Sequence, residues 1–305
     1  MVNMGNKDQR LFGGIEGGGT KFVCAVGTGP DDIRAEVRFP TTSPQETMAQ
    51  AVDFFQQQEN RFGKLSSIGF ACFGPLDPRP DSPTYGYILP TAKVGWTNAN
   101  VVGALRSAFD IPIAFDTDVN GAALGEWRWG NGKGLSTFMY LTIGTGVGGG
   151  AYTEGKLLHG LLHPEMGHIP LPHDKQKDPF EGACPFHGDC FEGLASGVAI
   201  ERRWGQRGGT LPPEHPAWDL EVEYISHALA AYSYTISPQR IILGGGVGQI
   251  PYLLPRIQHR TREMINGYIK SPSILENIDQ YIVHPGLGNL SGVLGAIALA
   301  ELALV

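Results

Sequence analysis

The sequence predicts an α/β protein with two related domains, and two observations lead to this prediction. Apolar, strand-like runs alternate with segments of helical periodicity along the chain. Each half opens with a strand, a glycine-rich turn and a returning strand, at residues 13–26 and again at 139–153. This internal echo favours two domains that face each other across a cleft over one continuous sheet.

The composition excludes several classes of protein and of binding partner. The 305 residues include 23 basic and 30 acidic side chains, for a net charge of −7, and no run of Lys or Arg, so nucleic acid and anionic membranes are not expected partners. No segment approaches the about 18 apolar residues of a membrane span, and no apolar signal core begins the chain. Four cysteines argue against a disulfide scaffold and favour the reducing cytoplasm.

The elements of the first half follow from local patterns. Residues 1–10 are polar and are expected to be a disordered tail. Apolar and small residues around Gly17–Gly19 predict a strand, a tight turn and a second strand over 11–27. Ser43 is a candidate N-cap for a helix over 43–62, with Pro44 in its first turn. The other elements expected here are a strand at 67–73, a helix at 99–109, a strand at 111–115 and a helix at 121–129.

The second half repeats this alternation. A strand at 137–143, the glycine turn Gly144–Gly150 and a strand from Ala151 are followed by a long loop, 162–190, with poor periodicity. The elements expected after this loop are a helix at 220–234, a strand at 240–243, a mostly helical stretch to 268, a strand from 283 and an Ala/Leu-rich helix at 291–304.

The segment Cys184-Pro-Phe-His-Gly-Asp-Cys190 predicts a metal site. Two thiolates and one imidazole, each separated by two residues, suit zinc, which usually has four tetrahedral ligands at a closed structural site. The upstream candidates for the fourth ligand are His159, His163, His168 and His173. The alternative is a loop with two structural cysteines and a surface histidine.

Three glycine-rich loops, each after an apolar strand, indicate phosphate binding. Glycine lets backbone N–H groups approach an anion closely, although ordinary hairpin turns would also explain Gly17–Lys21 and Gly144–Gly150 taken singly. Gly144–Gly149 fits the G-x-G-x-x-G spacing, but a strand follows it, which argues against a dinucleotide-binding fold. The third loop, Gly244–Val247, is expected to precede a helix, whose N-terminus favours phosphate.

Asp118 is the candidate general base. It follows the strand at 111–115 and precedes a helix expected to begin near Asn120. A capping role is an alternative for either Asp116 or Asp118. A carboxylate at a strand end can instead deprotonate a hydroxyl group that attacks phosphorus, and the helix N-terminus favours its ionised form. One such carboxylate, amide cradles and Mg²⁺ suffice for phosphoryl transfer.

These motifs together resemble the ROK family of sugar kinases and repressors. The resemblance runs from about residue 11 to residue 300 and is carried, in order, by Gly14-Ile-Glu-Gly-Gly-Gly-Thr-Lys21, Phe115-Asp-Thr-Asp-Val-Asn120, the Gly144–Gly150 loop, Glu165-Met-Gly-His168 and the Cys184–Glu192 cluster. It implies an actin/hexokinase-like (ribonuclease-H-like) fold of two α/β domains flanking a cleft. The small domain would contain 11–117 with the C-terminal helix 291–305, and the large domain 118–290 with the zinc-binding loop.

Details of the motifs look most like the fructokinase or mannofructokinase branch of that family. The resemblance implies an ATP-dependent hexose kinase that phosphorylates the 6-hydroxyl of D-fructose, with mannose as a further candidate, ATP, Mg²⁺ and Zn²⁺ as cofactors, and a cytoplasmic homodimer. The implied catalytic base is Asp118. The implied sugar contacts are Gly74, Thr117, Asp118, Glu165, His168 and Glu192. The implied nucleotide contacts are Gly18, Gly19, Thr20, Lys21, Gly144, Thr145, Gly146, Gly244, Gly245, Gly246 and Val247. The implied zinc ligands are His168, Cys184, His187 and Cys190, with His168 joining metal and sugar through its two ring nitrogens.

Three departures from the family pattern bear on the substrate. Glu16 stands where Asp is more frequent, Thr117 stands where Asn usually precedes the base, and 92–96 lacks the Asn-Leu-Pro-Gly-Trp pattern of many glucokinases. These departures argue against glucose, which remains an alternative substrate. A sugar-responsive regulator is a second alternative, but it requires a DNA-binding segment of several dozen residues before the first strand. A zinc hydrolase requires an open coordination position, which four protein ligands would close.

Overall fold

The computed structural model describes residues 10–304, so the expected tail at 1–10 lies outside the described residues except for Arg10. The chain forms two compact units. Unit 1 runs to Trp129 and includes 159–163 and the C-terminal stretch from Leu290, whereas unit 2 contains 130–158 and 164–289. This grouping differs from the expected boundary after residue 117, because helix α3 (Asp118–Trp129) packs against α10 (Ser291–Leu302).

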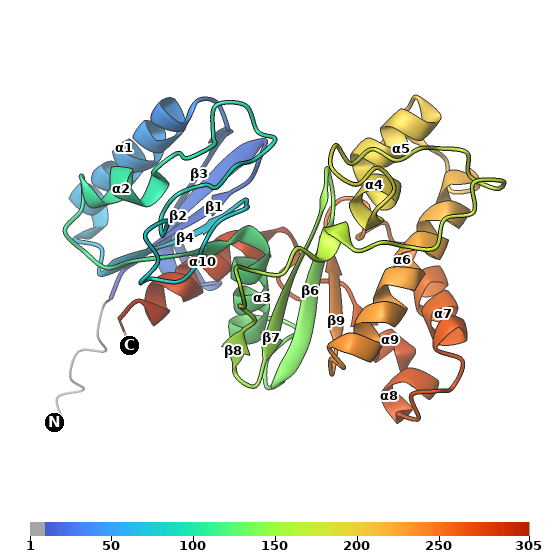
Figure 1. Ribbon diagram of the computed structural model, residues 1–305. Coiled ribbons are helices and arrows are strands. Elements are labelled where there is room, and N and C mark those ends of the chain that lie inside the picture. The colour runs from blue at the N-terminus through green and yellow to red at the C-terminus, as the bar shows by residue number, and fades with distance from the viewer. Residues whose placement is uncertain (1–9, 305) are drawn as a thin grey trace, which may run out of the picture. The chain divides into compact units, whose positions relative to one another are not determined.

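Unit 1 is built on a five-stranded mixed sheet (Figure 1). Its strands are β1 (Phe12–Gly17), β2 (Lys21–Gly29), β3 (Asp32–Pro40), β4 (Ser67–Cys72) and β5 (Ile113–Thr117). They lie in the order β3-β2-β1-β4-β5, with β1 antiparallel to β2 and parallel to β4, and with β4 parallel to β5. The expected strand–turn–strand over 11–27 is confirmed as β1 and β2.

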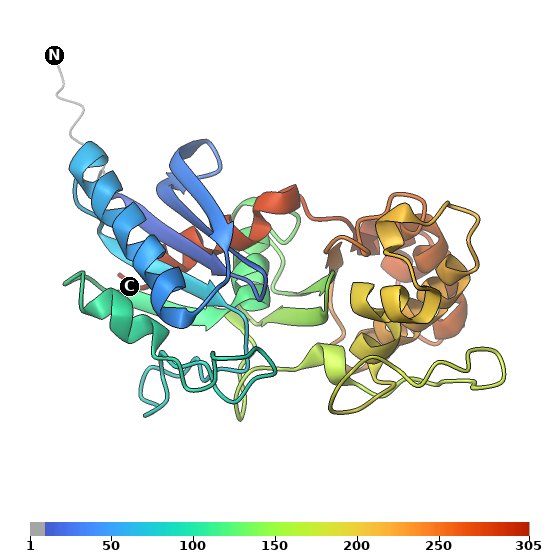
Figure 2. The ribbon, with the colours of Figure 1, turned by 90° about the horizontal axis from the view of Figure 1, so that it is seen from above.

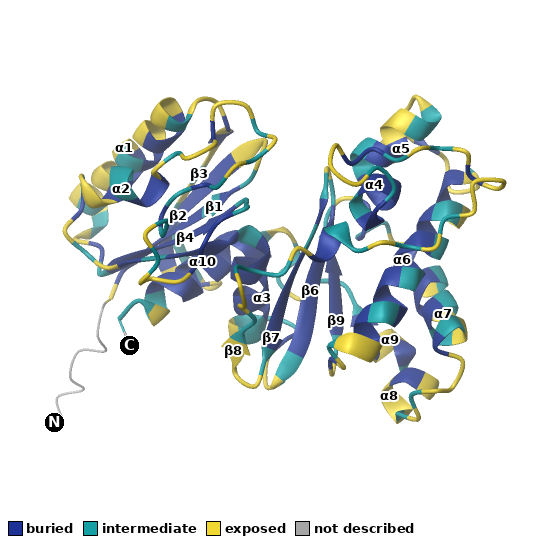
Figure 3. Ribbon diagram, in the orientation of Figure 1, coloured by how far each residue is buried: buried dark blue, intermediate teal, exposed yellow. Residues whose placement is uncertain are grey.

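Helices cover both faces of this sheet. The helices α1 (Pro44–Phe62) and α2 (Val101–Arg106) pack together on one face, and Figure 2 shows α1 and α10 on opposite faces. The Ser43 hydroxyl accepts a hydrogen bond from Glu46 N at 3.3 Å, which confirms the expected N-cap. The α10 helix lies between the sheet and α3, so its first ten residues are all buried (Figure 3).

Unit 2 repeats the sheet of unit 1 strand for strand. Its strands are β6 (Thr137–Ile143), β7 (Val147–Thr153), β8 (Lys156–Leu157), β9 (Ile241–Gly244) and β10 (Ile282–Val283). The order β8-β7-β6-β9-β10 again has two antiparallel neighbours followed by parallel strands. The internal echo in the sequence therefore reflects two units of one topology.

The helices of unit 2 complete its hydrophobic core. They are α4 (Phe191–Ala195), α5 (Gly197–Trp204), α6 (Ala217–Thr235), α7 (Leu254–Ile265), α8 (Pro272–Leu275) and α9 (Ile278–Tyr281), with one-turn 3₁₀ helices η1 (Met166–His168), η2 (Gly208–Thr210) and η3 (Gly288–Leu290, at the boundary with unit 1). Helix α6 packs against α4 and α7, and its Trp218 is fully buried. Within the described residues, the helices are too short or too polar for any of them to cross a lipid bilayer.

Several elements differ from the sequence-based expectations. Strand β3 was not expected, because most of its side chains are exposed or half-buried and it lies at the edge of the sheet. Helices α4 and α5 are too short to show clear periodicity. Helix α3 begins at Asp118 instead of Gly121. The loop Gly244–Val247 does not lead directly into a helix, since α7 begins only at Leu254, and the expected helix dipole is therefore absent from that loop.

Candidate active site and metal centre

In unit 1, three parallel strands end at one edge of the sheet. The register pairs Gly17 of β1 with Cys72 of β4, and Cys72 with Thr117 of β5. The turn after β1, the loop after β4 and Asp118 at the start of α3 therefore lie along the same edge. The carboxyl ends of parallel strands are the usual ligand-binding edge of such sheets.

Asp118 is half-buried at the N-terminus of α3. Its Oδ1 accepts a hydrogen bond from Val119 N at 2.9 Å. The helix is capped by its neighbour, because Thr117 Oγ1 accepts a hydrogen bond from Asn120 N at 3.1 Å. Thr117 is also only 2% exposed, so its expected contact with a sugar is not favoured by this geometry.

Asp116 holds the strand end that carries Asp118. This buried carboxylate accepts hydrogen bonds from Thr117 N at 2.7 Å, from Asn120 Nδ2 at 2.8 Å and from His159 Nε2 at 2.8 Å. The Asp116 carboxylate, through its hydrogen bond and its charge, raises the pKa of His159 despite partial burial of the ring. The cluster was missed at the sequence level because His159 lies far from Asp116 along the chain.

Glu16 is the second carboxyl group at this edge. Burial raises its pKa, with the negative charge of Asp118 as the next contribution, to about 7. A glycine in α10 makes room for the side chain, since a Cβ at Gly292 would lie 2.3 Å from Glu16 Cδ. The extra methylene of Glu16 is thus accommodated by the absence of a side chain opposite it.

The loop after β4 is held by a histidine from the segment 159–163. Leu76 N donates a hydrogen bond to His163 Nε2 at 3.2 Å, and a Cβ at Gly74 would lie 3.0 Å from the same nitrogen. His159 and His163 therefore belong to unit 1, with partners of their own. The sequence left both residues open as zinc ligands, and the structure excludes them from the Cys184–Cys190 cluster of unit 2.

The turn between β1 and β2 is open to a ligand at its tip. Gly18 N donates to Lys21 O at 2.9 Å and closes the turn, so the Gly18 amide is already used. A Cβ at Gly19 would meet no atom of the described residues within 4 Å, and Thr20 and Lys21 are exposed beside it. The groups that remain for an anion are the Gly19 backbone, the Thr20 hydroxyl and the Lys21 ammonium group.

In unit 2, the glycine loops after β6 and β9 lie side by side. The parallel register pairs Thr142 with Gly244, and a Cβ at Gly144 would lie 3.9 Å from Gly246 N. Gly245 has a φ of +83°, which favours glycine. Val247 N donates to Ile143 O at 2.8 Å, so the Val247 amide is not available to a nucleotide.

Four side chains of unit 2 form a candidate zinc site: His168, Cys184, His187 and Cys190, whose ligand atoms all lie within 4.8 Å of one another. Cys184 Sγ is 3.7 Å from Nδ1 of both His168 and His187, and Cys190 Sγ is 3.6 Å from His168 Nδ1. Tetrahedral zinc with ordinary bond lengths would separate sulfur and nitrogen ligands by about 3.6 Å. The donor set and its spacing fit zinc, and the His168 nitrogen that faces the thiols is Nδ1.

Glu192 connects this cluster to the glycine turn after β6. It lies two residues after Cys190, on α4, and its Oε2 accepts a hydrogen bond from Val147 N at 3.0 Å. A Cβ at Gly146 would lie 2.6 Å from the same oxygen, so glycine is required for this approach. On the other side of the cluster, Glu165 O accepts a hydrogen bond from His168 N at 3.0 Å.

Comparisons with known proteins agree with these features. The model of the ROK family matches residues 12–303. The chain is 44% identical to a fructokinase of Zymomonas mobilis subsp. mobilis over 96% of this chain and 97% of the relative, and 44% identical to a fructokinase of Lactococcus lactis subsp. cremoris over 95% and 96%. Among solved structures, it matches a ROK hexokinase from Thermus thermophilus with a TM-score of 0.77 and 26% identity, over 96% of this chain and 99% of that one.

Proposed function

The chain belongs to the ROK family, and from this premise we propose that it is a fructokinase, which transfers the γ-phosphoryl group of ATP to the 6-hydroxyl group of D-fructose. The near-complete coverage of fructokinases at 44% identity supports this activity. The structural observation that carries the proposal is the common edge of β1, β4 and β5, where a glycine turn and the Asp118 carboxylate come together.

In this reaction Asp118 acts as the general base. Its carboxylate accepts the proton of the 6-hydroxyl group while the hydroxyl oxygen bonds to the γ-phosphorus, and the bond from phosphorus to the β–γ bridging oxygen breaks as ADP leaves. The position at the N-terminus of α3 supports this role, because the helix end stabilises an ionised carboxylate. Asp116 and His159 hold the strand end that carries the base.

The proposed nucleotide contacts are taken from the glycine loops of each unit by itself. In unit 1 they are Gly19, Thr20 and Lys21, whereas Gly18 closes the turn. In unit 2 they are the backbone and hydroxyl groups of Thr145, Gly146, Gly244, Gly245 and Gly246, whereas the Gly144 amide donates to Gly146 O at 2.9 Å. Val247 is left out of the amide contacts because its N–H is bonded to Ile143 O. Mg²⁺ would neutralise phosphate charge, and Glu16 is the carboxyl group of unit 1 that would face it.

Zinc would be held by His168, Cys184, His187 and Cys190, with no open position for catalysis. Its contribution would be the rigidity of the loop that carries the proposed sugar contacts. These contacts are Glu165, His168 through Nε2, and Glu192, with Gly74 bordering the sugar from unit 1. Burial and the neighbouring Cys184 raise the pKa of the Cys190 thiol to about 11, and a bound cation would favour the thiolate form.

Mannose, a homodimer and a cytoplasmic location complete the proposal. The cytoplasm is where ATP is abundant and where thiols such as Cys184 and Cys190 stay reduced. A regulator that binds sugar without turnover is less favoured, because Asp118 is retained at the strand end.

An ADP-release assay across a panel of hexoses tests the activity. Turnover of fructose with ATP and Mg²⁺, and its loss in Asp118→Asn, is the expected result. Sugar binding without ADP release in the wild-type protein would instead support the regulator.

A further inference from the structure

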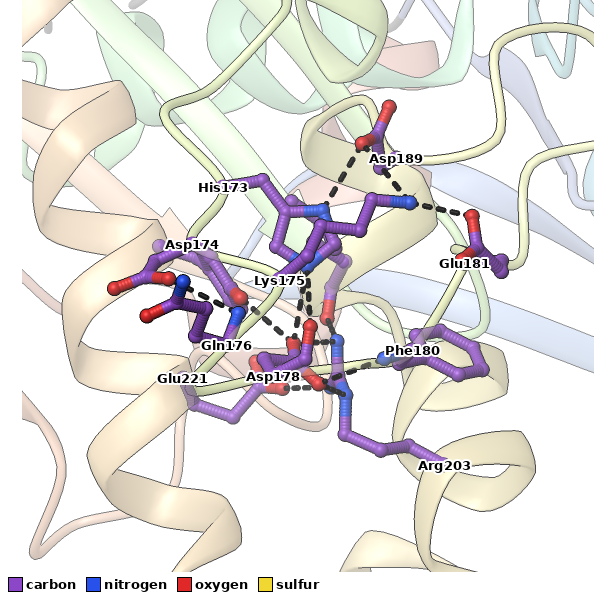
Figure 4. Close-up of polar contacts among 12 residues, drawn as sticks. His173, Asp174, Lys175, Gln176, Asp178, Phe180, Glu181, Asp189, Arg203 and Glu221 are labelled. Atoms are coloured by element: carbon purple, nitrogen blue, oxygen red, sulfur yellow. Dashed lines mark hydrogen bonds and ion pairs between the residues drawn. The ribbon is translucent and has the colours of Figure 1, made fainter.

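A network of charged side chains with a buried centre lies beside the candidate zinc site and takes no part in the proposed chemistry. Figure 4 shows its members, which come from the segment 169–183, from Asp189, from α5 and from α6. The segment 169–183, which the structure describes throughout, contains no helix or strand although it joins two zinc-ligand residues, His168 and Cys184. An irregular segment of this kind needs anchors other than secondary structure.

Arg203 of α5 is the centre of the network. Its side chain is only 6% exposed. Nε donates to Asp178 Oδ1 at 3.2 Å, and NH2 lies 3.1 Å from Asp178 Oδ2 and donates to Leu194 O at 2.9 Å. The guanidinium carbon also lies 4.5 Å from the centre of the Phe180 ring. One side chain thus joins the middle of the irregular segment to α4, the helix that begins directly after Cys190 and carries Glu192.

Asp178 extends the network to Asp189. Its Oδ2 accepts a hydrogen bond from Tyr224 OH at 2.6 Å, and its backbone carbonyl lies 2.9 Å from His173 Nε2. His173 Nδ1 lies 3.0 Å from Asp189 Oδ2. Both ring nitrogens of His173 thus face oxygen atoms, one of Asp178 and one of Asp189. The chain of contacts from Arg203 therefore reaches the residue immediately before the ligand Cys190.

Glu221 sets the network apart from a surface ion pair. Its side chain is fully buried on α6, and neither carboxyl oxygen has a hydrogen-bond partner among the described residues. Its Oε1 lies 3.8 Å from Arg203 NH1, which also lacks a hydrogen bond there. Burial raises the pKa of Glu221 well above its usual value. The closer ion pair of Arg203 is with Asp178, at 3.1 Å.

We infer that Arg203 is a positioning residue for the candidate zinc cluster and for the proposed sugar contact Glu192. It holds the 169–183 segment against the end of α4, so that Cys184, Cys190 and Glu192 keep their relative positions. This inference rests on the proposed function of the zinc cluster and of Glu192. An arginine is required because the planar fork bonds both oxygens of Asp178 and a carbonyl group while stacking on Phe180, which lysine does not reproduce.

The test compares Arg203→Lys with Arg260→Lys. Arg260 forms an equally bidentate pair with Glu223, at 2.8 and 3.1 Å, on α7 and α6 and without a contact to the zinc loop. Zinc release from the purified holoprotein to a chromophoric chelator is measured together with KM for fructose and KM for ATP. We expect Arg203→Lys to release zinc ~10–100-fold faster, which corresponds to the loss of metal affinity typical when residues that orient metal ligands are replaced. KM for fructose should rise while KM for ATP stays the same, and Arg260→Lys should match the wild-type protein.

Two results would overturn the inference: zinc release at the wild-type rate in Arg203→Lys, or the same acceleration in Arg260→Lys. If Arg203→Lys does not fold, Tyr224→Phe serves instead, because it removes only the 2.6 Å bond to Asp178 and keeps the ring. Wild-type zinc release from Tyr224→Phe would then count against the network. A wild-type protein that holds no zinc or does not turn over fructose would refute the proposed function instead.

Discussion

Asp118 is the residue whose replacement separates chemistry from binding. Asp118→Asn keeps the size and the hydrogen-bond geometry at the start of α3, but the amide cannot accept the hydroxyl proton. We expect kcat to fall ~10²–10⁴-fold, the range typical of general-base removal. Fructose affinity should stay within about tenfold, or 1.4 kcal/mol. Kinetics by ADP release and titration calorimetry measure the two quantities.

Asp110→Asn is the matched control for that experiment, because Asp110 is an exposed residue of unit 1 at the start of the loop before β5. It should behave as the wild-type protein. Turnover above about one percent in Asp118→Asn would remove Asp118 from the role of base.

Glu16 is expected to make stability depend on pH. Its pKa rises from 4.5 to about 7 on folding, so the folded chain holds a proton that the unfolded chain releases. The contribution to stability is greatest below about pH 4.5 and is lost as the pH rises through about 7, by up to roughly 3 kcal/mol. Glu16→Gln should flatten this dependence in urea unfolding at about pH 5 and about pH 8, measured without Mg²⁺. The exposed Glu276 provides the control Glu276→Gln, and an unchanged slope in Glu16→Gln would refute the pH coupling.

At the scale of elements, the strands and glycine turns were predictable because their signals are local. Apolar runs such as Ile68–Phe70 and the glycines after β1 and β6 mark strand ends wherever they occur. Strand β3 was not predictable in this way, since it is held by pairing with β2 and not by burial of its own side chains.

The partners in the site were predictable only where they lie close in sequence. The spacing of Cys184, His187 and Cys190 predicts a metal site. In contrast, the contact of Asp116 with His159 depends on a segment of unit 1 that lies beyond β8 in the chain. The buried position of Glu221 depends on the packing of α6. In the sequence, the only local sign of this burial is a charged residue on an otherwise apolar face of the helix.

The contact between α3 and α10 provides a prediction about packing. A Cβ at Gly295 would lie 1.8 Å from Gly121 O, so the two helices approach as closely as their backbones allow. Gly295→Ala must separate α10 from α3 and disturb the packing of α10 on the sheet that it covers, and overpacking of this kind costs ~1–3 kcal/mol. Chemical denaturation measures the loss.

Gly209→Ala is the control for helix packing, because a Cβ there would meet no described atom within 4 Å. It should leave the free energy of unfolding nearly unchanged. Equal stability of Gly295→Ala and the wild-type protein would contradict the close approach of α3 and α10.

The zinc loop is expected to bind one zinc ion per chain. Cys190→Ser replaces a thiolate ligand by a much poorer donor, so elemental analysis should fall well below a 1:1 ratio. KM for fructose should rise in the same variant, because Cys190 directly precedes the helix that carries Glu192. Phe186→Ala is the control within the loop, as this side chain is 72% exposed and is not a ligand. Zinc lost from Cys190→Ser with unchanged kinetics would show that the loop is separate from sugar binding.

At the scale of the whole molecule, the repeated topology explains why two glycine turns recur in the chain. In each unit the turn follows the central strand, β1 or β6, and leads into an antiparallel neighbour. A second parallel neighbour, β4 or β9, ends at the same edge in each unit. Each unit therefore places a glycine turn at the same topological position, while Asp118 lies in unit 1 and the candidate zinc cluster in unit 2.

The last prediction concerns the choice of sugar. The Thr117 hydroxyl oxygen caps α3 and the side chain is 2% exposed, so Thr117 does not offer a sugar the donor and acceptor of an amide. An unmatched sugar hydroxyl costs ~1–3 kcal/mol for a substrate that depends on that contact. Fructose has a different ring and anomeric arrangement and need not place a hydroxyl there. We therefore expect kcat/KM for fructose to exceed that for glucose by at least about tenfold, or 1.4 kcal/mol.

Thr117→Asn places an amide next to Asp118, and an asparagine side chain can also cap α3. We expect this variant to raise kcat/KM for glucose and so to lower the fructose-to-glucose ratio of kcat/KM. Measuring fructose, mannose and glucose with both proteins decides the substrate. Glucose equal to fructose in the wild-type protein contradicts the fructokinase proposal. A kcat/KM for mannose close to that for fructose would extend the activity to both sugars. Mannose shares most of the glucose ring, so the site would then distinguish mannose from glucose by the hydroxyl group at position 2. A ratio that Thr117→Asn leaves unchanged would move the source of specificity away from the β5–α3 junction.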